Sequence, residues 1–258
     1  MARPEDILRV KALLPTTLGS GEIRERIAAD ILRRSVFSAR MASAPYLAEL
    51  REVLVQFASG DVNRADATLA LTQSLERMGH SPQDGNAIAN PASQQRLDLI
   101  LKTNRQMAAS VARIEAQTPD TLDDFPGWEL MRFSGRRIPR EDWHRRWAAA
   151  GDAVGWQGAA RHTGDYPEWS FIALKSSPIW AALGSGAGGF RDTLGNPYPP
   201  FAYGSGLDWD DVGRERCEAL GLLEPGAQIT LERTSLAPGA AEVADMERRY
   251  GFDAGEDV

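Results

Sequence analysis

The residues suited to acid–base chemistry are few in this sequence. Of its three histidines, His162 is the candidate, because it lies next to Arg161 and near the carboxylates of Asp165 and Glu168. A histidine titrates near neutral pH, so His162 oriented by either carboxylate could serve as a general base in cleaving a nucleic acid or a peptide. Such catalysis also needs a nucleophile within reach, and the sequence identifies none. We therefore expect no catalytic residue and keep this enzyme as an alternative.

Cysteine and glycine motifs indicate no metal or cofactor site. The single cysteine, Cys217, excludes an internal disulfide and a multi-cysteine metal site, and its helical surroundings predict a small buried side chain. The run Gly184–Gly189, GSGAGG, fits the pattern G-x-G-x-x-G, but it follows a short helix rather than a strand. We interpret it as a turn, and we predict neither a metal nor a cofactor.

Clustered arginines form the candidate contact site for nucleic acid or an acidic partner. The cluster comprises Arg132, Arg136, Arg137, Arg140, Arg145 and Arg146. Phe133, Trp143 and Trp147 lie among them, and arginines beside exposed aromatic rings can hold phosphates and stack on bases. The competing and favoured interpretation is a solvated helix face paired with Glu141 and Asp142. A DNA-binding module remains a second alternative.

Composition and charge narrow the class of protein. The chain has 258 residues, of which 43% are hydrophobic and 25% charged, as in soluble globular proteins. No apolar run approaches the roughly 20 residues of a membrane span, so we expect no membrane contact. The N-terminus has no signal-peptide pattern, which indicates synthesis in the cytoplasm. The net charge of −7 is concentrated after residue 205, which disfavours a general polyanion binder.

The elements that must position these residues change in character near residue 120. Before it, apolar stripes predict helices: Ile23, Ile27 and Ile31 recur every four residues in one helix. Further helices are predicted from Pro45 to Gly60, with Leu47, Leu50, Leu54 and Phe57 inside, then from Asn63 or Asp66 to Met78, and finally over 93–116, with Leu97, Ile100, Leu101, Met107 and Val111 as the apolar face.

All seven tryptophans lie after residue 120, in a part of mixed character. Short strands are predicted over 128–133, 171–175 and 229–233, and short helices over 142–150, 178–183 and 214–220. The sequence thus predicts an α+β fold, in which a helical N-terminal part precedes a small mixed α+β module with few short strands. The expected organisation is a helical region over 1–119, the module over 120–235, with the helix 93–117 packed on it, and an acidic tail over 236–258.

The segment 192–212, DTLGNPYPPFAYGSGLDWDDV, predicts a loop held by its own aromatic residues. Its prolines fix φ and remove backbone donors, and its glycines permit positive φ, so we expect neither helix nor regular strand there. The aromatic residues Tyr198, Phe201, Tyr203 and Trp209 would anchor it on the folded surface.

Several segments together resemble a known family. They are RLDLILKTNRQMA over 96–108, FPGWELMRFSGRRIPR over 125–140, SFIALKSSPIWAAL over 170–183, and LGNPYPPFAYGSGLDWDDVGRERCEALGLL over 194–223. In this order they resemble the phage Mu F-like head morphogenesis proteins, also called phage minor head proteins. The residues that carry the resemblance are Arg96, Thr103, Asn104, Ala108, Trp128, Pro199, Pro200, Phe201 and Trp209. Better-known members end the proline motif with histidine and a set of cysteines, whereas Phe201 follows Pro200 here and those cysteines are absent, so aromatic packing stands in for any ligand set.

The resemblance implies a structural protein rather than an enzyme. Such proteins are low-copy components of the virion, located in the head interior or at the portal vertex. The implied partners are the phage portal protein and a capsid or scaffolding protein, with packaged DNA as a further partner. We expect Arg96, Thr103 and Asn104 to tie the long helix to the C-terminal module, and the proline loop to pack against the strands that bear Trp128 and Phe171.

Overall fold

The fold is α+β, as the sequence predicts, and it divides into two compact units. The computed structural model describes residues 2–83, 88–133, 142–155 and 171–233, together with Asp245, Arg248 and Arg249. The first unit is built on Met1–Ala112 and the second is Arg113–Arg233, so the boundary falls in the last turns of the long helix, whereas composition placed it at residue 120.

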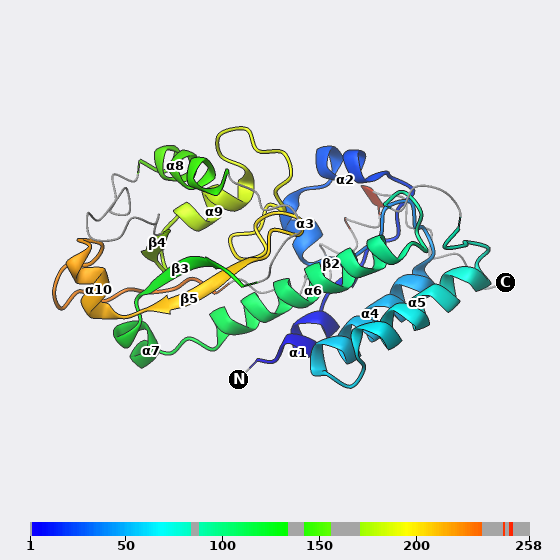
Figure 1. Cartoon of the computed structure of the whole chain (residues 1–258), viewed down its shortest axis with the longest axis horizontal. Helices are drawn as coiled ribbons and strands as arrows, with labels where there is room; N and C mark the ends of the chain where they lie inside the picture. Colours follow the sequence, from blue (N-terminus) through cyan, green and yellow to red (C-terminus); the bar gives the residue numbers. More distant parts are fainter. Residues whose placement is uncertain are drawn as a thin grey trace. The chain divides into compact units, whose positions relative to one another are not determined.

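The first unit is mostly helical (Figure 1). Its helices are α1 (Pro4–Arg9), α2 (Ser20–Arg26), α3 (Ala29–Arg33), α4 (Ala44–Ser59), α5 (Arg64–Arg77) and the beginning of α6 (Gln94–Glu115). The strands β1 (Ala12–Leu13) and β2 (Ser35–Val36) form a small parallel pair, with Ala12 opposite Ser35. Helix α4 packs against α1 and α5 and carries much of the unit's core.

The predicted boundaries of α4 and α5 are confirmed by their caps. The Ser43 hydroxyl accepts the backbone N–H of Tyr46 at the start of α4, and Gly60 ends that helix with a left-handed φ of 89°. The Asn63 side chain accepts two backbone N–H groups at the start of α5. The predicted stripe of α4 is buried as well, with Leu47, Leu50, Leu54 and Phe57 inside.

The single helix predicted from the isoleucine spacing is wrong. The backbone is extended at Ile27, where α2 ends, and α3 begins two residues later. Ile23 and Ile27 nevertheless belong to one buried cluster with Leu14, and Ile31 packs against it. The four-residue spacing therefore reflects two short helices that contribute to a common core.

The second unit consists of a small sheet with helices. Its elements are α7 (Pro119–Asp124), β3 (Gly127–Arg132), α8 (Trp143–Ala153), β4 (Ile172–Leu174), α9 (Ile179–Ser185), β5 (Leu207–Val212) and α10 (Arg214–Ala219). The strands are antiparallel in the order β4-β3-β5. Helix α10 and the chain that follows it pack on one face of the sheet. The buried contact is made by Ile172, Val212, Cys217 and Leu223.

Two strand predictions in this unit are wrong. Residues 207–212, expected to be loop, form β5 and pair with all of β3, because Gly206 (φ 70°) ends the irregular segment just before it. Leu207, Trp209 and Val212 are buried in this strand, while the aspartates between them are half-buried or exposed. Residues 229–233 form no strand; Ile229 instead packs partly buried against the α10 cluster.

Candidate functional site

The aromatic residues that carry the resemblance meet in one core. Trp128 of β3 and Trp209 of β5 stack with ring centroids 3.7 Å apart and planes 10° apart. Trp180 of α9 meets both rings edge-on, at 6.3 and 5.5 Å, and Phe201 lies 6.0 Å from Trp180 and from Trp209. All four side chains are buried. Three separate segments of the resemblance therefore build one module.

The proline loop is fastened to α9 by backbone contacts. Gly195 donates its N–H to the carbonyl of Gly184 at 2.9 Å, and a Cβ on Gly184 would lie 1.7 Å from the carbonyl oxygen of Asn196. The Asn196 amide donates to the Pro200 carbonyl at 3.3 Å, across the cis peptide between Pro199 and Pro200. Only glycine fits at position 184, so the loop and the end of α9 form one packed piece.

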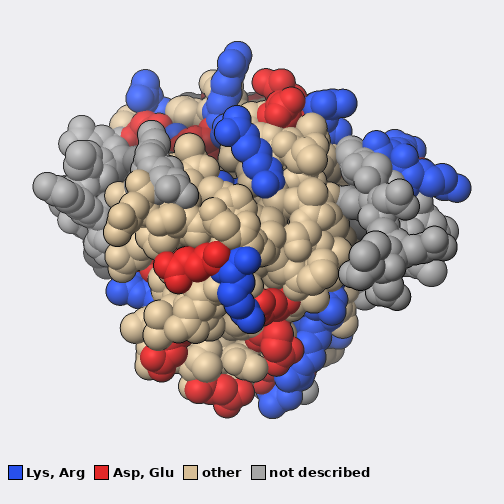
Figure 2. Space-filling view, turned by 90° about the vertical axis from the view of Figure 1, so that its right-hand side faces the viewer, with Lys and Arg blue, Asp and Glu red and all other residues tan. Residues whose placement is uncertain are grey.

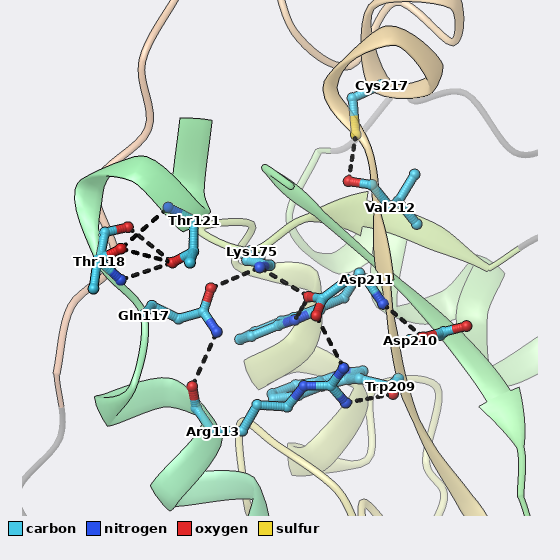
Figure 3. Close-up of polar contacts among 11 residues, drawn as sticks. Arg113, Gln117, Thr118, Thr121, Lys175, Trp209, Asp210, Asp211, Val212 and Cys217 are labelled. Atoms are coloured by element: carbon cyan, nitrogen blue, oxygen red, sulfur yellow. Dashed lines mark hydrogen bonds and ion pairs between the residues drawn. The ribbon is translucent and has the colours of Figure 1, made fainter. Parts of the chain in front are cut away.

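A polar network lies beside the tryptophan stack (Figure 3). The buried Lys175 ammonium donates to Gln117 Oε1 at 2.7 Å and pairs with Asp211 Oδ1 at 2.9 Å. Trp128 Nε1 donates to the same carboxylate oxygen at 3.1 Å. Burial lowers the pKa of Lys175 against the opposing effect of Asp211. Burial alone would raise the pKa of Asp211, but the hydrogen bonds and charges of Lys175 and Arg113 together outweigh it and hold that pKa below its usual value.

Arg113 joins this network from the end of α6. One guanidinium nitrogen donates to the Trp209 carbonyl at 2.6 Å, and the other pairs with Asp211 Oδ2 at 3.1 Å. The Gln117 side-chain amide donates to the Arg113 carbonyl at 3.0 Å, and the Gln117 backbone carbonyl accepts from the Arg233 guanidinium at 3.0 Å. The polar groups of this network bond to one another within the second unit. Their role is structural, because they hold the last turn of α6 against the sheet. Sequence reasoning missed this network, because its members are distant in the chain.

The hydrogen bonds described for Arg96 and Asn104 lie within the first unit, and their predicted role in tying α6 to the C-terminal module stays a prediction. The buried Arg96 guanidinium donates to the Ala39 carbonyl and to Ser38 Oγ at 2.9 Å. Asn104 accepts from the buried Lys11 ammonium at 3.4 Å and donates to the Ile100 carbonyl at 3.0 Å. Thr103 is half-buried on the same helix. Within the second unit, Arg113 in the last turn of α6 bonds to β5, and Gln117, which follows α6, bonds to Lys175.

The described members of the arginine cluster do not share one surface. Arg132 and Arg145 are exposed, whereas Arg146 is buried and pairs with Asp142 at 3.0 Å and Asp192 at 2.8 Å. The rings of Phe190 and Trp143 lie 4.3 and 5.1 Å from the Arg146 guanidinium. Arg146 is therefore a structural residue and not a phosphate contact.

The aromatic residues of the cluster are also mostly internal. Trp143 and Trp147 are buried on α8, so they do not present faces for stacking on bases, and only Phe133 is exposed. Arg136, Arg137, Arg140, His162, Asp165 and Glu168 lie outside the described residues. On the face drawn in Figure 2, the positive and negative side chains that are described lie interspersed.

Neither the cysteine nor the glycine run forms a reactive site. Cys217 is buried as predicted, and burial raises the pKa of its thiol. The glycine run after α9 is a turn, with positive φ at Gly186, Gly188 and Gly189. Within the described residues, no three His, Cys, Asp or Glu side chains are arranged to hold a metal ion. None of the described helices has the length and apolar character needed to cross a membrane.

No family model, no curated protein and no solved structure matches this chain.

Proposed function

We propose that this chain is a minor head protein of a bacteriophage: a non-enzymatic virion component that contacts the portal protein and the capsid or scaffolding protein during head assembly and DNA packaging. The observation that carries the proposal is the convergence, in one core, of the aromatic residues of the resemblance. Trp128, Phe201 and Trp209 come from two separate segments and pack together, as the parts of one inherited module would.

The polar contacts support a cohesive role rather than a catalytic one. Lys175, Asp211 and Arg113 satisfy one another beside the tryptophan stack, and Arg146 is saturated by two carboxylates. A catalytic base or nucleophile must be free to meet a substrate, and these ionisable groups are committed to partners within the protein.

The test is the composition of purified particles. Phage particles are isolated from the source strain by two successive density gradients, and the chain and the portal protein are quantified against isotope-labelled peptides. We expect this chain at a constant ratio to portal across the particle peak, with far more of the major capsid protein. An abundant host cytoplasmic protein, which should fall away between the gradients, serves as the control. If the chain falls away with it while portal stays, it is not a virion component.

Portal contact is tested separately by co-expression. Tagged portal protein should retain the full-length chain through a salt wash, and it should retain a Cys217→Ser variant of unchanged near-UV circular dichroism equally well. Retention of the chain by untagged resin, or no retention by portal, would remove portal from the list of partners.

A further inference from the structure

The strand β5 lies at an edge of the sheet, and its register shows which backbone groups point outward. In the described part of the chain, β5 pairs only with β3. Phe133 donates its N–H to the Gly206 carbonyl at 3.0 Å, which makes these two residues a hydrogen-bonded pair. Because hydrogen-bonded and non-bonded pairs alternate along antiparallel strands, Asp208 and Asp210 bond to β3. The backbone N–H groups of the intervening residues therefore point away from β3, to the outer edge.

Each of these outward N–H groups is taken by a nearby side chain. Leu207 donates to Ser205 Oγ at 3.3 Å, Trp209 to Asp208 Oδ1 at 2.8 Å, and Asp211 to Asp210 Oδ1 at 3.0 Å. The last of these bonds is visible in Figure 3. All three outward N–H groups of β5 are therefore bonded to side chains of preceding residues.

The outward carbonyl of Trp209 is occupied as well. Arg113 donates to it at 2.6 Å, and the ion pair between Arg113 and Asp211 at 3.1 Å holds the guanidinium across the edge (Figure 3). The caps at Asp208 and Asp210 are the side chains of a half-buried and an exposed residue.

We propose that Asp208, Asp210 and Arg113 close this edge of the sheet against strand addition by a second copy of the chain. An uncovered edge strand is a template on which another strand can pair through its free N–H and C=O groups. An incoming β5 from a second copy would have to displace the side-chain caps before it could bond. This inference concerns self-association and does not depend on the function proposed above.

The experiment compares two double variants that differ only in the cap. Asp208→Ala with Asp210→Ala removes acceptor and charge, whereas Asp208→Asn with Asp210→Asn removes the charge and keeps a carbonyl acceptor. We expect the alanine pair to self-associate with rising concentration in sedimentation velocity and to gain an intermolecular β-sheet infrared band, while the asparagine pair sediments as the wild type does. An alanine pair that sediments as the wild type, or an asparagine pair that associates equally, would overturn the proposal.

Near-UV circular dichroism of the tryptophan stack shows whether the alanine pair folds. If it does not fold, the proposal is tested by a measurement on the wild-type protein. The side-chain caps should slow amide hydrogen exchange at Trp209 and Asp211 by at least about tenfold relative to an unstructured chain. Exchange of these two amides at the unstructured rate would show that the caps do not hold in solution, and the proposal would fail.

Discussion

Replacing the buried Lys11 by methionine should stabilise the first unit at neutral pH. Lys11 is only 1% exposed, and its ammonium has one hydrogen bond, to Asn104 Oδ1 at 3.4 Å. No carboxylate pairs with it among the described residues, which leaves a positive charge in the protein interior without a counter-charge. A buried ammonium in such surroundings is costly, because burial removes its hydration.

The size of the effect follows from the pKa of Lys11. Burial lowers this pKa from its ordinary value of 10.5 to about 8. The unfolded chain therefore binds more protons than the folded chain between these two values, so the Lys11 contribution makes the folded state more stable as the pH rises through that window. Below pH 8 the full penalty applies, and it amounts to about 3 kcal/mol of unfolding free energy. Losing the bond to Asn104 offsets about 1 kcal/mol, so the net gain at pH 7 is about 2 kcal/mol.

Denaturant unfolding of the full chain at several pH values tests this reasoning. All seven tryptophans follow residue 120, so their fluorescence reports on the second unit, and far-UV circular dichroism reports chiefly on the helices of the first. The Lys11→Met change should shift the circular dichroism transition and leave the tryptophan transition in place. Lys102→Met removes an exposed lysine from the same unit and is the matched control, for which we expect no shift.

The pH dependence of the difference between variant and wild type is decisive. The gain from Lys11→Met should be largest at pH 7 and should disappear as the pH approaches 10.5, whereas other titrating groups act on both proteins alike. A gain that is the same at every pH would mean that packing, and not the charge, is responsible. No gain at pH 7 would mean that the Lys11 ammonium is solvated, and the burial argument would be refuted.

Three further changes test other contacts. Asn104→Leu should lower the unfolding free energy of the first unit by about 2 kcal/mol, because Lys11 loses its acceptor, and the loss should shrink in a Lys11→Met background in the same denaturant experiment. Arg146→Met should destabilise the second unit by about 3 kcal/mol, as it leaves two carboxylates without their cation; an unchanged tryptophan fluorescence transition would contradict this. Gly184→Ala should weaken the second unit through its collision with Asn196, which thermal unfolding followed by tryptophan fluorescence would show. Gly213→Ala is the control, because Gly213 has a φ of −65° and an added Cβ would lie 3.9 Å from its nearest neighbour.

Elements were predictable from the sequence where local signals agreed with packing. In α4 and α5, a cap at one end, glycine at or just after the other, and an apolar stripe all point to the same helix. The run from Ile23 to Ile31 carried only the stripe, and two short helices satisfy it as well as one long helix does. The strand β5 was missed because the prolines and glycines before it dominate the composition of its segment, while its own alternation is short.

The polar networks could not be predicted, since their members are brought together only by the fold. Lys175 and Asp211 are far apart in the chain, and neither lies in a recognisable motif. The clustered arginines show the reverse case: proximity in sequence suggested a common surface, but helical geometry turns Arg146 inward and leaves Arg145 outside. Neighbours on a helix point in different directions, so a sequence cluster alone does not define a patch.

The residues that carry the resemblance are poor probes of the proposed function, because they are structural. Loss of head assembly after a change at Trp128, Arg96 or Phe201 would follow from loss of the fold, whatever the protein does. A change at an exposed position of the same module can separate the two effects. Phe133 is 61% exposed, so Phe133→Ser should leave both unfolding transitions in place. If such a variant folds normally yet is missing from particles, the missing contact is with a partner and the second unit takes part in it; if it is incorporated normally, the contact lies elsewhere on the chain.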